Sequence, residues 1–313
     1  MFPSLSTSIK PCQKFLLLIV AALFVVCIKT STWASEQKTV PETNNSQTFL
    51  QVVKNDKKIV TKLQTGVGRY ELIRKGKPKV TVDLIGAVHI GDEAYYETLN
   101  KQFKQYDAML FELVAPPEVL KYGIKPRKGD RSNASFISQL QMYMKDTLKL
   151  EFQLEHVDYT PKNFVHADMS PEQLFATMRK KGETPFNLML RVLQASTTQN
   201  TAKAQETQML MMLTMFDEPD SRALKLKRLF AEEFINNESF MNAMNGKNGL
   251  ALLTDRNDVA LDVMQEQIDA GKTNIGIFYG AAHLPDMHEK LIKTYGMKLD
   301  KISWLDAWVI EEE

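Results

Sequence analysis

Two stretches far apart in the sequence share one pattern of apolar and polar positions. In the first, an apolar run leads through Gly86, Ala and Val to His89, and in the second an apolar run leads through Gly280 and two alanines to His283. A short run rich in β-branched and aromatic residues that stops at a glycine and a polar side chain predicts a buried strand ending at the rim of a sheet. Each histidine is therefore expected at the carboxyl end of a strand.

Helical spacing follows both histidines. Apolar side chains recur at steps of three and four positions, at Tyr95, Leu99, Phe103 and Tyr106 after the first histidine and at Leu284, Met287, Leu291 and Tyr295 after the second. A further apolar run then closes each unit. The pattern predicts two units, each built as strand, Gly-x-x-His, helix and strand.

The closing strand of the first unit ends on Glu112. Two strands joined by a helix form a parallel pair with a right-handed crossover, and both strands of such a pair end at the same edge of the sheet. His89 and Glu112 are therefore expected to meet there, at the edge where open α/β sheets bind their ligands. His283 is expected to join them, because the two units look like two halves of one site.

The remaining patterns give the expected boundaries of the fold. Short alternating runs between residues 48 and 75 predict antiparallel strands on one side of the sheet, whereas most of residues 134–245 has helical spacing. We therefore expect an α/β fold with a mixed sheet built from the two units and an all-helical insertion between them. The first half of the α/β domain is expected at 48–130, the insert at 131–249 and the second half at 250–313.

One part of the insert is not helical in pattern. Residues 158–170 are polar and carry His166 and Asp168, and Ser170 with Gln173 gives the start of a helix with a capping box. His166 and Asp168 lie two apart on an extended segment, so they point the same way, as metal ligands or their hydrogen-bond partners do. They are candidates to line the site, and the alternative is that they only fix a loop.

The first 35 residues are typical of a secretory signal. Lysines flank a polar start, residues 15–28 are continuously apolar, and a small-x-small cleavage site follows. The leader is thus expected at 1–35 and a disordered linker at 36–47, with export to the periplasm or the cell exterior and membrane contact only if the leader stays uncleaved. Both cysteines, Cys12 and Cys27, lie in this leader, so no disulfide is expected in the mature chain.

Composition bears on the class of partner. Lys and Arg number 39 and Asp and Glu number 38, which gives a formal net charge of +1. No basic block follows the leader, so nothing favours nucleic-acid binding. An apolar fraction of 44% over 313 residues is ample for the core of an enzyme.

His89, Glu112 and His283 together offer two imidazoles and one carboxylate. Three such ligands suit zinc, manganese, cobalt or iron and leave positions open for water and substrate. Water bound to such an ion is nucleophilic near neutral pH, and the ion also polarises a carbonyl, so the set supports hydrolysis of an amide or ester. The alternative for each histidine taken alone is a buried structural residue.

Other polar residues are candidates to support these ligands. Arg256, near the start of a helix, is expected to stabilise an oxyanion or hold a substrate carboxylate, or else only to pair with a neighbouring aspartate. Asp92 and Asp286 each follow a histidine by three positions, where they cap the next helix or support the site. His156 and His288 are expected at the surface.

The two Gly-x-x-His sequences, the Phe-Glu that ends in Glu112 and the Arg256-Asn257 pair together resemble the TraB/GumN family, which includes the Tiki proteins. The likeness covers residues 70–118 and 250–308. It implies an α/β fold with both histidines and the glutamate in one site, Asn257 beside it, and, for the Tiki-like branch, peptidase activity that depends on manganese or cobalt. Other branches are described as blocking peptide pheromones, and a more distant relative binds haem.

The expected function is metal-dependent hydrolysis of a peptide or another amide, with His89, Glu112 and His283 as ligands, Arg256 as a further catalytic residue, and Mn, Co or Zn as the ion. Two alternatives stay open. One is a binding protein that sequesters a peptide or haem without turnover. The other is a metal-independent, esterase-like hydrolase in which Glu112 and one histidine act as acid and base.

Overall fold

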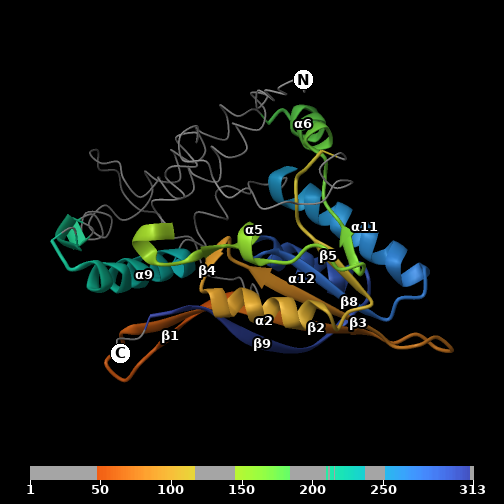
Figure 1. Cartoon of the computed structure of the whole chain (residues 1–313). Coiled ribbons are helices and arrows are strands. Elements are labelled where there is room, and N and C mark those ends of the chain that lie inside the picture. Colours follow the sequence, from red (N-terminus) through yellow and green to blue (C-terminus); the bar gives the residue numbers. More distant parts are fainter. Residues whose placement is uncertain are drawn as a thin grey trace, which may run out of the picture.

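One mixed sheet of seven strands forms the centre of the structure (Figure 1). The computed structural model describes residues 48–116, 145–183, 209–210, 212–214, 216–236 and 251–310. The strands of this sheet are β1 (Leu50–Lys54), β2 (Val60–Leu72), β3 (Val80–Ala87), β5 (Ala108–Phe111), β7 (Phe164–His166), β8 (Asn274–Gly280) and β9 (Lys298–Val309). They are bonded in the order β1-β2-β3-β8-β5-β7, with β9 paired to β2. The predicted α/β class is confirmed.

Four neighbouring strands, β3, β8, β5 and β7, run parallel. Because β8 lies between β3 and β5, the two strands of the first unit are not direct neighbours, and the predicted pairing between them is wrong. β8 is buried except at its two end residues, and a strand covered on both faces is favoured in the middle of a sheet. All three strands still end at the same edge, so Ala87, Phe111 and Gly280 lead into one region.

The other half of the sheet is antiparallel. β2 pairs with β1 and β3 along one edge and with β9 along the other. The predicted antiparallel strands are present, and Gly66 and Gly68 lie inside one of them, β2. A Cβ added at Gly68 would lie 3.0 Å from the Phe49 ring, so glycine allows that ring to pack on β2. The second unit also differs from the first, since its closing strand β9 pairs with the antiparallel strand β2 and not with a strand of the parallel set.

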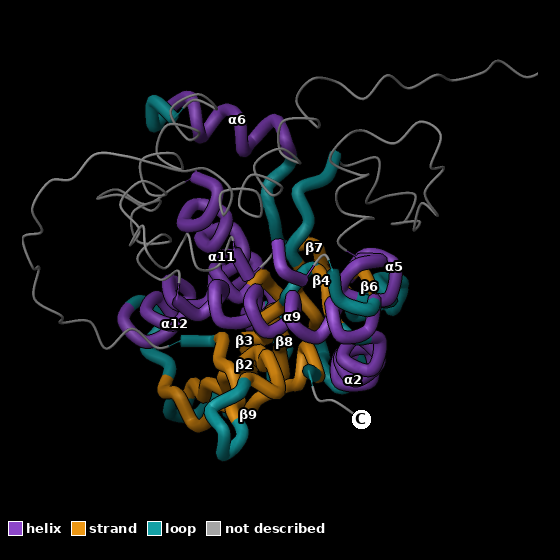
Figure 2. Tube along the Cα trace, turned by 90° about the vertical axis from the view of Figure 1, so that its left-hand side faces the viewer, coloured by secondary structure: helices purple, strands orange, loops and turns teal. Residues whose placement is uncertain are grey.

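Helices cover both faces of the sheet. The side chains of α2 (Glu93–Phe103) share one core cluster with Phe278, while those of α11 (Arg256–Asp269) and α12 (Leu284–Lys293) share another with Ile277 and Tyr279. Successive residues of a strand point to opposite faces, so β8 contributes to both clusters. Figure 2 shows α2 and α11 on opposite sides of the strands. The edge where the parallel strands end is thus bordered by both layers of helices.

The predicted insert contributes strands as well as helices, so an all-helical insert is wrong. β7 extends the sheet beyond β5, and β6 (Glu151–Phe152) pairs with β4 (Ile90–Gly91) in a small second sheet. Strands of two or three residues are too short to show alternation in a sequence. The insert's described helices include α5 (Gln153–His156), α6 (Pro171–Lys180) and α9 (Pro219–Asn236).

The start of α6 follows the sequence prediction. The Ser170 side chain accepts a hydrogen bond from the backbone N–H of Gln173, and the Gln173 side chain accepts one from the backbone N–H of Ser170. Gly182, just past the helix, has a φ of +69°, which glycine adopts without the strain a Cβ brings. This helix is therefore fixed by local chemistry, and the segment before it leads directly from β7.

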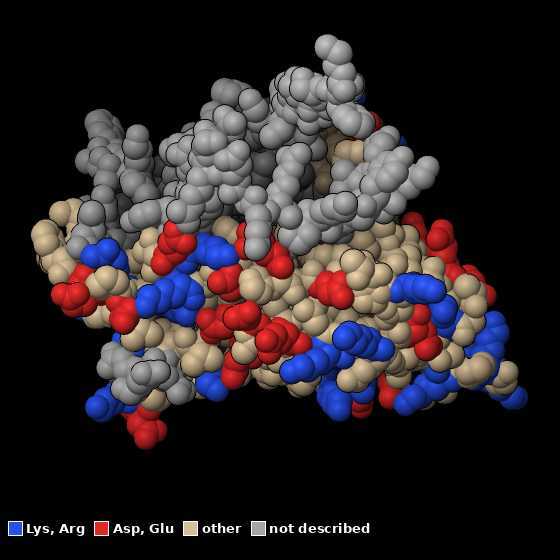
Figure 3. All heavy atoms as spheres, viewed as in Figure 1, with Lys and Arg blue, Asp and Glu red and all other residues tan. Residues whose placement is uncertain are grey.

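The predicted leader, residues 1–35, and linker, residues 36–47, lie outside the described residues, as do both cysteines. Within the part of the chain that the structure describes, no helix is long and apolar enough to cross a membrane. On the face drawn in Figure 3, Lys and Arg side chains are interspersed with Asp and Glu. That face accordingly shows neither sign of charge concentrated over the described elements.

Candidate functional site

Glu112 is the first residue after β5 and lies at the carboxyl edge of the parallel strands. Its Oε2 accepts a hydrogen bond of 2.7 Å from the backbone N–H of Gly280, at the end of β8. Its Oε1 accepts one of 2.6 Å from Nη2 of Arg256 and lies 3.4 Å from Nε2 of His283. The end of β8, the start of α11 and the turn before α12 therefore hold one carboxylate.

Arg256 begins α11 directly after a π-helical turn, Ala251–Asp255. Its guanidinium donates to Asp168 through Nε and Nη2, at 2.8 and 2.6 Å, and the same Nη2 reaches Glu112. Hydrogen bonds between a guanidinium and carboxylates are strong, and single π-helical turns are frequent at functional sites. Arg256 is thus engaged by carboxylates of the protein itself, which leaves its predicted role toward a substrate without support from these contacts.

His283 is buried at the end of the short 3-10 turn Ala281–His283. Its Nδ1 lies 2.6 Å from Oδ1 of Asn257. The Asn257 Nδ2 donates to the His283 carbonyl at 3.2 Å and to Oδ2 of Asp286 at 2.7 Å. Two acceptors on Nδ2 fix the orientation of the amide, so Oδ1 accepts and Nδ1 of His283 carries the proton. Asn257, which the resemblance places beside the site, therefore bonds directly to His283, and Asp286 bonds to Asn257.

His89 lies between β3 and β4 and is exposed. Its Nδ1 is 3.2 Å from Oε1 of Gln153, and Nε2 of Gln153 donates to the Tyr159 hydroxyl at 2.9 Å. The charge of a protonated His89 is among the influences that lower the pKa of Glu112, so the two side chains interact electrostatically. His89 is therefore the exposed member of the group, and His283 the buried one.

The electrostatics of the site favour an ionised Glu112. Burial alone would raise the pKa of its carboxyl, but Arg256, then His283 and His89, hold that pKa well below its usual 4.5. Burial opposes the charge of Arg256 as well, yet Glu112 and Asp168 raise its pKa. Burial and the Asp168 carboxylate raise the pKa of Tyr279, whose hydroxyl donates to the Ala167 carbonyl. The site thus combines a carboxylate that is charged at neutral pH with a permanent cation.

The side chains of Glu112 and His283 present acceptor atoms that fit a bound cation. With its proton on Nδ1, a neutral His283 presents Nε2 as an acceptor, and this atom faces Oε1 of Glu112, a second acceptor, at 3.4 Å. Two acceptors at this separation are stabilised by a metal ion or by a proton. Metal-bound histidines in proteins usually donate their other ring N–H to an oxygen, and Asn257 supplies that oxygen here.

The third predicted ligand, His89, lies farther from this pair than Glu112 and His283 lie from each other. Among the described residues, the only three His, Cys, Asp or Glu side chains with ligand atoms all within 4.8 Å of one another are Glu151, Glu155 and His156. His89, Glu112 and His283 do not form so tight a set. The Glu151 group already has a cation, since the Lys145 ammonium pairs with Glu151 and, at 2.7 Å, with Glu155. Its carboxylates are satisfied within the protein.

Two of the predicted residues have other partners. Asp92 makes no side-chain cap to α2; its carboxylate accepts from Lys227 at 3.1 Å and from the backbone N–H of Val309 at 2.6 Å. His166 donates through Nε2 to the Leu113 carbonyl at 2.7 Å. Of the predicted pair His166 and Asp168, therefore, Asp168 joins the Arg256 cluster and His166 holds the segment after Glu112.

The two histidines expected at the surface are partly exposed, and each has a partner within the protein. Nε2 of His156 lies 2.9 Å from Oε2 of Glu151, and its ring stacks on Tyr96. Nδ1 of His288 lies 2.7 Å from the Tyr70 hydroxyl. Helical spacing shows which face of a helix is apolar, but it does not show that a strand such as β2 lies beside the edge of that face.

Gln153, which contacts His89 from the insert, is not among the residues predicted from the sequence. No periodicity, cap or neighbouring motif in the sequence distinguishes this glutamine from the others of the chain. The backbone N–H of Gly280 is likewise absent from the predicted partners of Glu112, although the glycine at the strand end belongs to the predicted pattern. Backbone donors carry no sequence signature, so only the arrangement of β5 beside β8 reveals this contact.

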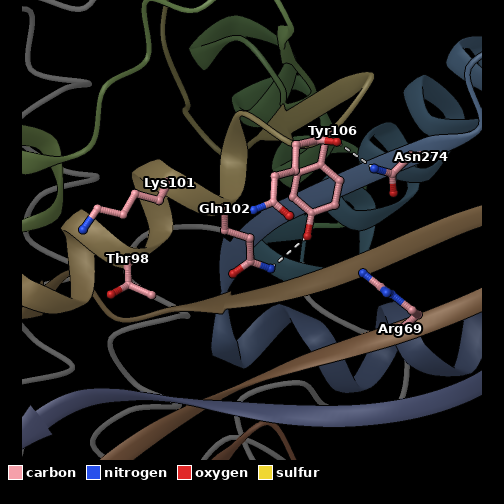
Figure 4. Close-up of a pocket in the computed structure, with 7 residues that line it drawn as sticks. Arg69, Thr98, Lys101, Gln102, Tyr106 and Asn274 are labelled. Carbon is pink, nitrogen blue, oxygen red and sulfur yellow. Dashed lines mark hydrogen bonds between the residues drawn. The ribbon is translucent and has the colours of Figure 1, made fainter.

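A surface pocket of about 380 Å³ lies at the opposite edge of the sheet (Figure 4). It is lined by Arg69, Thr98, Lys101, Gln102, Gln105, Tyr106 and Asn274. Asn274 begins β8, whose other end, Gly280, contacts Glu112. The guanidinium of Arg69 is already bonded to the buried Asp83 at 2.8 and 2.7 Å. This pocket is separate from the candidate site and is built around a satisfied structural ion pair.

The fold and these contacts define an α/β protein whose candidate site lies at the carboxyl edge of its parallel strands. No family model, curated protein or solved structure matches the chain. The resemblance to the TraB/GumN family therefore remains a prediction made from the residues.

Proposed function

We propose that this chain is an exported hydrolase of peptide or other amide bonds that uses a divalent metal ion such as Mn, Co or Zn. His283 and Glu112 would hold the ion, and His89 would complete the set. The observation that carries the proposal is the pair of acceptors facing each other at 3.4 Å, with the other ring nitrogen of His283 bonded to Asn257. The resemblance to a family with metal-dependent members points the same way.

The chain's own residues have distinct tasks in this proposal. Arg256 keeps Glu112 ionised and oriented, because its guanidinium binds both Glu112 and Asp168. Asn257 keeps the proton of His283 on Nδ1. When bound, the ion supplies a nucleophilic water near neutral pH and polarises the scissile carbonyl. The exposed position of His89 leaves the site open to a substrate on that side.

A second candidate is metal-independent hydrolysis by Glu112 and His283 as base and acid. The observation that favours it is the contact of 2.6 Å between Arg256 and Glu112 Oε1, the same oxygen that faces His283. A guanidinium on this oxygen competes with a metal ion for it. In this candidate His283 carries both ring protons and donates one to Glu112, and a proton takes the position of the ion.

Metal content of the mature protein separates the two candidates. The parent protein, Glu112→Gln, His283→Gln and a control variant, His288→Asn, are loaded with manganese, cobalt or zinc, dialysed and measured by elemental analysis. We expect one ion per chain in the parent and in the control, whose histidine bonds to Tyr70 away from the site, and loss of the ion in the other two.

Hydrolysis of a peptide library by the same samples completes the test. Turnover that appears only with the bound ion supports the metal-dependent hydrolase. A parent that binds none of the three metals yet hydrolyses substrate supports the second candidate. Stoichiometric metal without turnover of any peptide or amide contradicts a hydrolase and favours the sequestering protein.

A further inference from the structure

The segment that carries His89 is held by the insert rather than by the main sheet alone. Ile90 pairs with Phe152 and Gly91 with Glu151 in the small sheet of β4 and β6. The backbone N–H of Gln153 then donates to the His89 carbonyl at 3.0 Å. The insert therefore holds the carbonyl of His89 and the two residues that follow it.

The Gln153 side chain makes a second contact that the backbone pairing does not require. Its Oε1 lies 3.2 Å from Nδ1 of His89, and its Nε2 donates to the Tyr159 hydroxyl at 2.9 Å. Gln153 is 6% exposed although His89 is exposed. With the amide nitrogen of Gln153 donating to Tyr159, the amide oxygen accepts from Nδ1 of His89 and leaves Nε2 of that ring as the acceptor.

This arrangement repeats the one at the other histidine. Asn257 presents an amide oxygen to Nδ1 of His283 at 2.6 Å and uses its Nδ2 to anchor itself on Asp286. Gln153 presents an amide oxygen to Nδ1 of His89 and uses its Nε2 to anchor itself on Tyr159. The two amides come from unrelated parts of the chain, one from α11 and one from the insert, yet both leave the same ring nitrogen free.

We infer that Gln153 is the positioning residue of His89: it keeps the His89 proton on Nδ1 so that Nε2 is the atom offered to the ligand that His283 and Glu112 bind. The inference rests on the proposed function for the nature of that ligand, a divalent metal ion. It assigns to the insert a part in building the site, because a histidine held this way offers a fixed ligand atom instead of two interchangeable ones.

The experiment compares Gln153→Leu with Gln102→Leu. Gln102 is a matched control, since its Nε2 also donates to a tyrosine hydroxyl at 2.9 Å, that of Tyr106 at the opposite edge of the sheet. A third variant, Gln153→Glu, retains an acceptor oxygen for Nδ1 but loses the amide donor. Circular dichroism and thermal unfolding establish that each variant folds as the parent does.

The first readout is the tautomer of His89 in metal-free protein. The chain has five histidines, and nitrogen-15 NMR at a pH where the imidazoles are neutral distinguishes a protonated from an unprotonated ring nitrogen. We expect the proton on Nδ1 of His89 in the parent, Gln102→Leu and Gln153→Glu, and a mixture or the Nε2–H form in Gln153→Leu. His283 is expected to keep its proton on Nδ1 in all four proteins.

The second readout is metal affinity by titration calorimetry. Loss of a partner that orients a ligating histidine weakens metal binding by about 10- to 100-fold, so we expect this loss in Gln153→Leu and parent-like binding in Gln102→Leu. A folded Gln153→Leu protein that keeps the Nδ1–H tautomer of His89 overturns the inference. If the parent binds no metal, the proposed function fails, while the tautomer of His89 still decides the role of Gln153.

Discussion

The two Gly-x-x-His units carry the same sequence pattern but meet the site in different ways. In the second unit, His283 is buried, bonded to Asn257 from the neighbouring helix and close to Glu112. In the first unit, His89 is exposed and is held by Gln153 from the insert. One histidine is thus part of the core of the α/β domain, whereas the other depends on a segment inserted between the two halves.

The glycines of the two units differ in the same sense. A Cβ at Gly86 would lie 3.2 Å from the Gly66 carbonyl oxygen and 3.4 Å from Leu284, so this glycine serves packing between strands and α12. A Cβ at Gly280 would lie 3.3 Å from Oε2 of Glu112. An identical motif therefore serves the core in one unit and the carboxylate in the other, which a pattern of residue types does not reveal.

The largest effect is expected from Arg256→Met, which tests how much the ion pairs of Arg256 around the second histidine contribute to stability. The change leaves Glu112 and Asp168 as buried carboxylates without their cation, and breaking such a pair costs about 3–5 kcal/mol of the free energy of unfolding. Urea unfolding measures it. The control is Arg69→Met at the opposite edge, where the Arg69 side chain is 40% exposed and Asp83 keeps its hydrogen bond from the Tyr106 hydroxyl; we expect a smaller loss there. Equal losses in the two variants would contradict the special status of the Arg256 cluster.

Exchanging each histidine for alanine measures how deeply each unit is built into the core. His283→Ala removes a buried ring and the partner of Asn257, so we expect the free energy of unfolding to fall by about 1–3 kcal/mol. His89→Ala alters an exposed side chain and is expected to change it by no more than about 0.5 kcal/mol. Both variants should lose metal binding. A large loss of stability in His89→Ala would remove the distinction between the two units.

Alanine at each glycine separates packing from site geometry. At Gly86 the added methyl meets a backbone oxygen that has little room to move, so we expect a loss of about 1–3 kcal/mol in the free energy of unfolding. At Gly280 the methyl meets the end of the Glu112 side chain, so we expect a smaller loss of stability but a clear drop in metal affinity. Thermal unfolding and titration calorimetry on both variants test this. A larger loss of stability in Gly280→Ala than in Gly86→Ala, with metal affinity lost mainly in Gly86→Ala, would contradict these roles.

The smallest effect concerns His288, a histidine of α12 outside the site. Burial lowers the pKa of its imidazole below the usual 6.5, so folding favours the neutral ring. Its contribution to stability is complete above pH 6.5 and is lost as the pH falls from 6.5 toward the folded-state pKa. Because the ring is only half-buried, we expect less than about 1 kcal/mol.

The measurement is the difference in free energy of unfolding between the parent and His288→Asn at pH 7.5 and at pH 5. Asparagine keeps an acceptor for the Tyr70 hydroxyl and does not titrate. The stability advantage of the parent should shrink at the lower pH. An advantage that grows as the pH falls would mean that the charged ring is the one favoured in the folded chain.

Much of the fold followed from local patterns. The strands that end at Ala87 and Gly280, the amphipathic helices after them and the capping box at Ser170 all lie where the sequence placed them. Short elements and strand order did not follow. β7 has three residues, too few for a periodic signal, and the position of β8 between β3 and β5 depends on burial of that strand on both faces.

The sequence by itself determined the elements and the chemical types at their ends, because periodicity, glycines and caps act within a few residues. It also brought Glu112 and the two histidines to one edge, since parallel strands end together. Only the tertiary structure decided which residues hold them: Gly280 and Arg256 on Glu112, Asn257 on His283 and Gln153 on His89. Hydrogen bonds between residues far apart in the sequence depend on strand order and on the docking of the insert, and these are settled by burial of surfaces that no short stretch contains.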